Sequence, residues 1–493
     1  MPYKSRIIPA LILIPAALAL VGCGRSGEQE ALDTAAKPGV APKPAIRVIE
    51  ASLPERFRAP LPSTSQELQA WARGERPNLP PPSHLRDHLL QGATETISQI
   101  ELAAQQVDPA DWQAWGQVWS DLVGYYRPEP AFCAESQPVI AGADSALRQA
   151  LIGLYAGTCF KSDEIAWMDR PDTPGFAILR FYESEIYENP RPVRAYSPRL
   201  AAVIGARIEN DEAWRVGQYA ALLADQPDAA ATRDLLALHA RIKDPIRADG
   251  VAAALNRSKL PEARAVFMAL CQRHPEHSSC RSAPGQDTPA DSAPEVVNRE
   301  AQRNTAAALV AAGFERIGGL DLDTTDAVTA DDLLVAAGHA IWFDVETGTF
   351  PNEHDSLLRS LARLITPTLD ACVFEEVPPG LDDESGPYVL NAYWAGKQYS
   401  GYAENLGDWY DLDAVLDLIN RVVVDSGSTQ RFVVLATGDQ TAIVLAAPID
   451  TIQRASQAGL IELADPSVAQ ALGKAAEAHV QAILERGGPA QTP

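Results

Sequence analysis

The sequence predicts a multi-domain chain: a mostly α-helical, repeat-like domain over residues 84–280, followed by an α+β domain with a mainly antiparallel sheet over residues 297–486. Two kinds of periodicity lead to this division. Apolar residues recur at helical spacing in the middle of the chain, whereas strand-like alternation becomes frequent only after residue 297. Between the two, residues 281–296 hold three prolines and one large apolar residue, which is typical of a linker.

The first 22 residues have the organisation of a signal peptide. A short basic start precedes an apolar run over residues 7–20, which is too short to cross a membrane because a spanning helix needs about 20 apolar residues. The run ends in Leu20–Cys23 (LVGC), which resembles the lipobox of bacterial lipoproteins. The resemblance implies cleavage before Cys23 and lipidation of its thiol. Because Gly24 rather than Asp follows, it also implies sorting to the outer membrane, facing the periplasm.

The two ends of the mature chain are predicted to have little fixed structure. Residues 23–83 are rich in proline and alanine and show no sustained apolar period, so we expect a lipid-anchored and only partly ordered tether. Residues 487–493 are expected to form a disordered tail. A plain signal peptide with a chance cysteine is the alternative to the lipid anchor.

The chain is strongly acidic, with 65 acidic and 41 basic residues and a formal net charge of −24. Most of the excess lies after residue 300. Such a charge argues against nucleic acid or anionic lipid as an electrostatic partner. The sequence therefore predicts a membrane contact only through the N-terminal lipid, and a protein partner with a basic surface.

The cysteines predict disulfides rather than a metal site. Five follow the lipidation site: Cys133, Cys159, Cys271, Cys280 and Cys372. In an oxidising periplasm the sequence-neighbour pairs Cys133–Cys159 and Cys271–Cys280 are expected, although the sequence leaves other connectivities open. His274 and His277 lie between the second pair, and such a Cys₂His₂ set also suits zinc. The spacing is too tight to favour one tetrahedral site, so we predict neither a metal nor another cofactor.

Tryptophans at helical spacing mark the helical domain. Trp112-x2-Trp115-Gly116-x2-Trp119 resembles the first helix of a tetratricopeptide repeat. Ala263-x3-Phe267, followed by Pro275, resembles the second helix of that repeat. The resemblance implies paired helices that stack into a protein-binding surface. No regular 34-residue period connects the two matches, so a helical-hairpin domain without true repeats is the alternative.

The α+β domain follows from alternation and turn residues. Ile341, Phe343 and Val345 alternate with polar or amphipathic residues, which predicts a half-buried strand. The remaining elements expected in chain order are a helix over 355–365, a strand over 371–377, a hairpin of 388–394 with 397–404, a helix over 412–423, a hairpin of 431–437 with 441–447, and two closing helices.

Catalytic motifs are present only as fragments. Asp344 and Glu346, on one face of the predicted strand, resemble the first motif of DnaQ-like exonucleases, but no second acidic motif follows. Asp425-Ser-Gly resembles the motif of aspartic proteases, but the helical period running into it favours a helix end. His84 and His88 lack the glutamate of a zinc protease. The sequence thus favours a non-enzymatic protein, with a carboxylate-dependent envelope hydrolase as a distant alternative.

An aromatic-rich segment over residues 388–410 is the predicted partner-binding surface. Adjacent aromatic residues in a strand point to opposite faces, so we expect some of the rings to be exposed. The predicted docking residues are Tyr393, Trp394, Tyr399, Tyr402, Trp409 and Tyr410. We therefore expect an outer-membrane-anchored protein-binding or scaffold component of the envelope. An inhibitor or immunity protein against a basic toxin or lytic enzyme is the second hypothesis.

Overall fold

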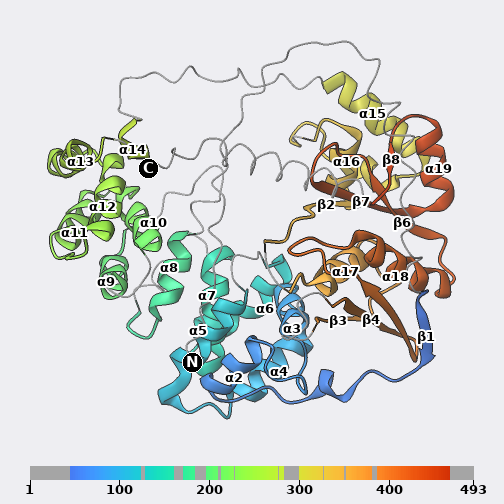
Figure 1. Cartoon of the computed structure of the whole chain (residues 1–493), viewed down its shortest axis with the longest axis horizontal. Helices are drawn as coiled ribbons and strands as arrows, with labels where there is room; N and C mark the ends of the chain where they lie inside the picture. Colours follow the sequence, from blue (N-terminus) through green and yellow to red (C-terminus); the bar gives the residue numbers. More distant parts are fainter. Residues whose placement is uncertain are drawn as a thin grey trace, which may run out of the picture. The chain divides into compact units, whose positions relative to one another are not determined.

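The computed structural model describes residues 45–123, 128–159, 170–183, 196–208, 213–226, 228–275, 277–281, 299–325, 327–348, 351–379 and 386–466. The chain divides into two compact units (Figure 1). One is Pro54–Val296, and the other combines Met1–Leu53 with Val297–Pro493. The predicted signal peptide, Cys23, most of the predicted linker and the predicted tail lie outside the described residues. Within the described residues, no helix combines the length and apolar character needed to cross a bilayer.

The first unit is helical, and its sequence sets where the helices begin. Proline occupies the first turn of several of them, where its missing N–H has no intrahelical partner to lose. The helices are α2 (Ser65–Ala72), α3 (Pro82–Leu90), α4 (Thr94–Ala104), α5 (Trp112–Val123), α6 (Pro130–Ala141), α7 (Ala146–Thr158), α8 (Gly175–Glu183), α9 (Pro198–Arg207), α10 (Ala213–Ala224), α11 (Ala229–His239), α12 (Pro245–Ala254), α13 (Pro261–Arg273) and α14 (Ser278–Arg281), with short 3₁₀ turns at Glu55–Arg58, Pro109–Asp111 and Leu255–Arg257.

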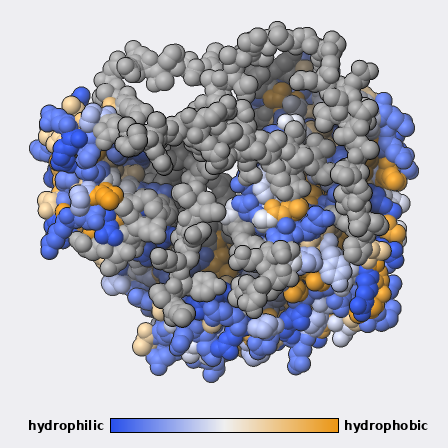
Figure 2. Space-filling model, viewed as in Figure 1, coloured by the Kyte–Doolittle hydropathy of each residue, from blue (hydrophilic) through white to orange (hydrophobic). Residues whose placement is uncertain are grey.

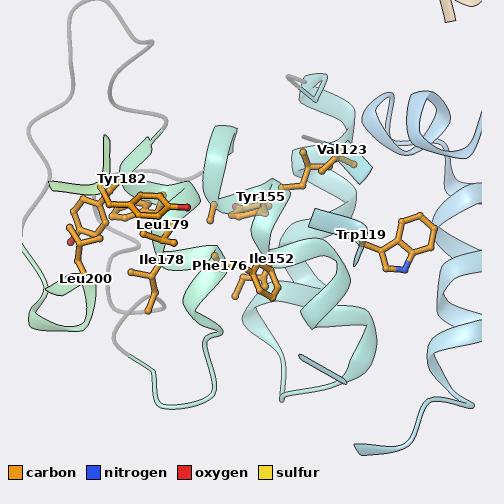
Figure 3. Packing of buried hydrophobic residues seen from close by; sticks show 14 of the residues in the cluster. Trp119, Val123, Ile152, Tyr155, Phe176, Ile178, Leu179, Tyr182 and Leu200 are labelled. Carbon is orange, nitrogen blue, oxygen red and sulfur yellow. The ribbon is translucent and has the colours of Figure 1, made fainter. Parts of the chain in front are cut away.

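These helices stack in two layers. Helices α5, α7, α8, α10 and α12 contact one another in chain order, while α6, α9, α11 and α13 pack against them as a second layer. Glycines permit the closest approaches: a Cβ on Gly116 of α5 would lie 2.5 Å from the carbonyl oxygen of Gln149 in α7, and Gly217 of α10 faces Gly250 of α12. Large buried side chains such as Trp119 and Phe176 fill the space between helices (Figure 3).

Two disulfides link neighbouring helices of this unit. Cys133 of α6 pairs with Cys159 at the end of α7, and Cys271 of α13 pairs with Cys280 of α14. Cys372, in the other unit, is a free and buried thiol. Both pairs are those predicted from the sequence.

The second unit is α+β. Its elements are β1 (Arg47–Glu50), α15 (Arg299–Ala312), a 3₁₀ turn (Glu315–Gly319), α16 (Ala330–Ala336), β2 (Ala340–Asp344), α17 (His354–Arg363), β3 (Val373–Val377), β4 (Tyr388–Trp394), β5 (Lys397–Ala403), α18 (Leu412–Asp425), β6 (Gln430–Leu435), β7 (Thr441–Pro448), α19 (Ile449–Gln457) and β8 (Leu463–Ala464). They form two four-stranded sheets, in the orders β1-β5-β4-β3 and β2-β7-β6-β8, and every pairing is antiparallel. The predicted fold class is confirmed.

Helix α18 lies at the centre of this unit because it contacts strands of both sheets, β4 and β5 on one side and β6 on the other. Its buried face and that of α17 join the inner faces of the two sheets in one apolar core. The opposite face of the β2-β7-β6-β8 sheet forms a second core with α15, α16 and α19. The outer face of the other sheet carries polar side chains, among them Glu375, Asn391 and Ser400.

Part of the segment predicted as a partly ordered tether, residues 23–83, forms regular secondary structure instead. Strand β1 pairs with β5, from Arg47 opposite Ser400 to Glu50 opposite Lys397 (Figure 1). Val48 packs against the core of the α+β unit, and Gly401 leaves the space that the Ile46 side chain approaches. The strand holds only two apolar residues, Val48 and Ile49, which are adjacent and do not stand out from a proline-rich background, so the sequence did not predict it.

The helical unit also begins earlier than predicted. Trp71 of α2 is fully buried, and its indole N–H donates to the carbonyl oxygen of Pro80 at 2.6 Å. The prolines after residue 79, predicted as part of the tether, instead lead into α3, which starts at Pro82. Proline marks helix starts as well as flexible segments, and burial of a nearby tryptophan decides between the two.

Candidate functional site

A cavity of about 310 Å³ opens on the helical unit between α5, α8 and α10. Among the residues that the structure describes, the charged lining consists of Asp121 and three arginines, Arg180, Arg207 and Arg215. This volume falls at the lower end of the range typical of small-ligand pockets. The cavity is therefore the candidate binding site.

Helical periodicity places the lining side chains. Gln117 and Asp121 are four residues apart on α5, as are Phe176 and Arg180 on α8 and Arg215 and Tyr219 on α10. Residues at this spacing share one face of a helix. Three helices of the same layer thus turn one face each towards the cavity, and Arg207 joins them from the last residue of α9.

Burial and three guanidinium groups have opposite effects on the carboxyl group in the cavity. Arg180, Arg207 and Arg215 all act on the carboxyl group of Asp121, whose Oδ1 accepts a 2.6 Å hydrogen bond from the Gln117 amide. Burial nevertheless raises the pKa of Asp121 above its ordinary value, because desolvation outweighs these stabilising contacts. Arg180, Arg207 and Arg215 thus place three guanidinium groups in the described part of the lining, in a chain that is acidic overall.

Part of the cavity lining is apolar. Phe176 and Leu179 of α8 belong to the buried core cluster shown in Figure 3 and also line the cavity. Tyr219 of α10 is likewise buried to within a few per cent and adds an aromatic ring to the lining. The cavity is therefore lined by three large apolar or aromatic side chains as well as by charged and amide groups.

A second polar cluster lies inside the α+β unit. Nε2 of His354 accepts the backbone N–H of Asp411 at 3.1 Å, so Nδ1 donates to the Glu376 carboxylate at 2.7 Å. The rings of Tyr388 and Tyr410 pack against the imidazole, and burial raises the pKa of Glu376. His354 is 0% exposed. Solvent cannot reach the imidazole. Its hydrogen bonds link α17 to β3 and to the start of α18, so we assign the cluster a structural role.

The acidic residues of the exonuclease-like fragment lie at the end of β2. The Asp344 carboxylate accepts the backbone N–H of Glu346 at 3.0 Å and the Gln440 amide at 3.1 Å. Asp425 ends α18, and Gly427 follows with a positive φ, as expected for a helix end rather than a protease turn. Across the residues that the structure describes, no three His, Cys, Asp or Glu side chains gather as a metal site.

The histidines considered as metal ligands have other contacts. Cys271 and Cys280 are joined as a disulfide, so they are not available as thiolate ligands. His274 contacts Asp249, with 3.4 Å between Nε2 and Oδ2. The rings of His84 and His88 lie side by side on α3, with centroids 4.3 Å apart.

The aromatic segment is mainly core, and of the predicted docking residues, some of which were expected to be exposed, one is. Tyr393, Tyr399 and Trp409 are buried, Trp394 and Tyr410 are half-buried, and only Tyr402 is exposed, at 50%. Alternation does send Tyr393 and Trp394 to opposite faces of the sheet. However, the Tyr393 hydroxyl donates to Glu375 at 2.9 Å within a buried polar network, so the outer face is not open there. A docking role for this segment remains a prediction that rests on Tyr402.

Sequence reasoning missed two exposed features. Trp342 of β2 is 58% exposed, and its alternation with Ile341 and Phe343 was a signal that could have identified it. The arginine-lined cavity had no such signal, because its lining residues come from four separate helices, α5, α8, α9 and α10. On the face seen in Figure 2 the described surface is largely hydrophilic, with hydrophobic residues in small scattered groups.

Comparisons with protein-family models, with curated proteins and with solved structures found no match for this chain. The tetratricopeptide resemblance therefore remains a prediction. Its motif residues do pack as helix-pairing residues: Trp115, Trp119, Ala263 and Phe267 are all buried.

Proposed function

We propose that the chain is a lipoprotein held in the outer membrane by lipid on Cys23, and that it serves as a protein-binding or scaffold component of the cell envelope. The observation that carries the proposal is the cavity between α5, α8 and α10 in a two-layer helical stack. Stacked helices present continuous surfaces that suit extended protein partners. A partly apolar cavity with a few converging polar groups suits the anchoring residue of such a partner.

The anchor is tested by fractionating cells that produce the wild-type chain or Cys23→Ser. The wild type is expected in the outer membrane with acyl chains on its N-terminal peptide by mass spectrometry, and the variant in the soluble periplasm. A Cys23→Ser protein that stays in the membrane fraction, beside a wild type without lipid, contradicts the anchor.

The binding role is tested by photo-crosslinking in cells. Gln218 in the cavity is replaced by p-benzoylphenylalanine, and the matched control carries the same replacement at Arg233, an exposed residue of α11 outside the cavity. Position 218 is expected to give a discrete cross-linked product with an envelope protein, and position 233 is not. Equal products from both positions, or none from position 218, would count against a binding cavity.

A further inference from the structure

We propose that strand β2 binds an extended, basic segment of a partner protein as an added antiparallel strand. This proposal rests on the protein-binding function above. It names a second surface for that function, on the α+β unit, and the chemistry of the segment that the surface accepts. Such a segment has the basic character predicted for the partner from the acidity of the chain.

The outer backbone edge of β2 is open. The strand lies at the edge of the β2-β7-β6-β8 sheet, beside β7 (Figure 1). The Ala446 N–H donates to the His339 oxygen and the Val345 N–H to the Gln440 oxygen, so the odd-numbered residues of β2 turn their backbone groups towards β7. The N–H and C=O groups of residues 340, 342 and 344 therefore point away from β7, and within the described part of the chain nothing bonds to them.

An exposed tryptophan lies at the centre of this edge. Trp342 is 58% exposed. The other three edge strands are protected against pairing in ordinary ways: β1 and β3 carry charged residues, and β8 is two residues long. Strand β2 has no charge before its last residue, Asp344. Of the four edges, it is the one whose side chains favour an added strand.

The charges around β2 favour a basic segment. Asp344 is exposed at the end of the strand, and the exposed Asp439 bonds to Thr441, the residue paired with Asp344. No lysine or arginine occurs in residues 317–358 or 432–453, the segments that contain β2 and β7. A cationic side chain opposite Asp344 therefore gains attraction, whereas a second copy of this chain would bring another net charge of −24.

Antiparallel pairing fixes the order of side chains in the added segment. Its residue opposite Trp342 needs an apolar side chain that covers the indole ring, and its residue opposite Asp344 lies two positions earlier. The basic residue thus precedes the apolar one by two positions. This order also keeps the cation away from Arg316, which donates to His339 near the other end of β2.

The test uses the purified full chain and the fluorescein-labelled peptide Ser-Lys-Val-Tyr-Val-Ser with an amidated C-terminus, followed by fluorescence anisotropy. Two further forms carry one backbone N-methyl group, either on the tyrosine or on the valine after it. In the proposed pairing the tyrosine N–H donates to β2 and that valine N–H points away. Methylation of the tyrosine is expected to weaken binding at least about tenfold, and methylation of the valine by less than about twofold. Equal affinities of the two forms, or no binding of the parent peptide, overturn the proposal.

Substitutions assign the binding to β2. Trp342→Ser is expected to weaken the peptide about tenfold. Asp344→Asn keeps an oxygen for the Glu346 backbone N–H, and it should remove an about threefold preference for the peptide over a form with glutamine in place of lysine. Asp370→Asn, at an exposed acid of the same unit outside β2, is the control and should keep that preference.

The lysine preference also separates a lost contact from a damaged fold, since the glutamine peptide should bind Asp344→Asn as it binds the wild type. An Asp344→Asn protein that still prefers lysine, or an Asp370→Asn protein that does not, overturns the assignment to β2.

Two further outcomes distinguish the possible failures. If the purified chain sediments as a dimer that Trp342→Ser dissociates, the occupant of the edge is a second copy and the partner assignment is overturned. In cells, p-benzoylphenylalanine at position 342 complements the probe at position 218. Peptide binding without cross-linking at either position would refute the scaffold role and keep the chemistry of β2, whereas cross-linking at position 218 without peptide binding would refute only the added strand.

Discussion

His339 shows how one buried side chain makes stability depend on pH. It lies just before β2, with its ring against Phe314, and its Nδ1 accepts a 2.9 Å hydrogen bond from the Arg316 guanidinium. Burial and the adjacent cation lower the pKa of His339 from 6.5 to about 4. Both effects disfavour the imidazolium, so the folded protein holds this ring neutral.

The direction in which stability changes with pH follows from which state, folded or unfolded, binds a proton at His339. Between pH 6.5 and 4 the unfolded chain binds a proton at His339 that the folded chain does not, so stability is lost as the pH falls through this window. The loss is expected to be roughly 2–3 kcal/mol. His339→Gln keeps an acceptor for Arg316 and removes the titration, so urea unfolding at pH 7 and pH 4.5 should show a smaller difference for the variant. An equal loss of stability in the variant and the wild type would show that His339 is not the source of the pH dependence.

At the scale of elements, glycine residues set how closely two helices approach each other. Gly116 of α5 packs on the backbone of α7, so an added methyl group would overlap the Gln149 carbonyl oxygen. Gly157 near the end of α7 has, among the described residues outside its own helix, no atom within 4 Å of its Cβ position. The two positions share helical backbone and differ in the space around them.

Alanine at these two positions should therefore have opposite effects. Gly116→Ala forces α5 and α7 apart and is expected to destabilise the helical unit by about 1–3 kcal/mol. Gly157→Ala gains helix propensity and is expected to stabilise it by up to about 1 kcal/mol. Urea denaturation followed by circular dichroism measures both. Loss of stability in both variants to the same degree would show that close packing is not the cause.

The two disulfides should differ in their contribution because they close loops of different length. Cys133–Cys159 encloses a separation of 26 residues and Cys271–Cys280 one of 9. In the chain-entropy model the longer loop contributes about 3.5 kcal/mol and the shorter roughly 1 kcal/mol less. Replacing each pair by alanine and comparing denaturation midpoints checks the order. A larger loss from the shorter loop would contradict it.

The elements that the sequence predicted are those whose pattern is complete within a short window. Strand β4 was expected over 388–394 and has those bounds, and the helix end after Asp425 follows from Ser426 and Gly427. The predictions that were wrong concern residues whose burial depends on contacts with residues far away in the sequence. Trp409 is buried because it packs in the core between the sheets, and no local pattern around it distinguishes that role from exposure.

At the scale of the whole molecule, the α+β unit is discontinuous in sequence. Strand β1 occupies the edge of its sheet beside β5, and the entire helical unit lies between β1 and α15. A fragment containing residues 297–493 therefore lacks one strand of the sheet. An unpaired edge strand is a site for association with other chains.

We expect that fragment to be less stable and more prone to aggregation than the same fragment preceded by residues 44–52 through a short flexible linker. Light scattering and urea unfolding of the two fragments check this expectation. The matched control replaces Val48 in the added segment by Asp, which removes an apolar contact with the core. If all three behave alike, β1 contributes little to the fold of the unit.

The position of β1 also fixes the order in which the protein can be completed. Synthesis delivers β1 first, yet its partner β5 follows only after the whole helical unit has been made, since Arg47 pairs with Ser400. The helical unit can fold from contacts between helices that are close in sequence while β1 is still unpaired. Pairing of β1 with β5, in contrast, closes a loop that contains the whole helical unit. A chain interrupted before residue 397 would carry a finished helical unit and an orphan strand. In such a molecule the backbone groups of β1 that pair with β5 in the complete protein lack that partner, and an unpaired strand is a site for association with other chains.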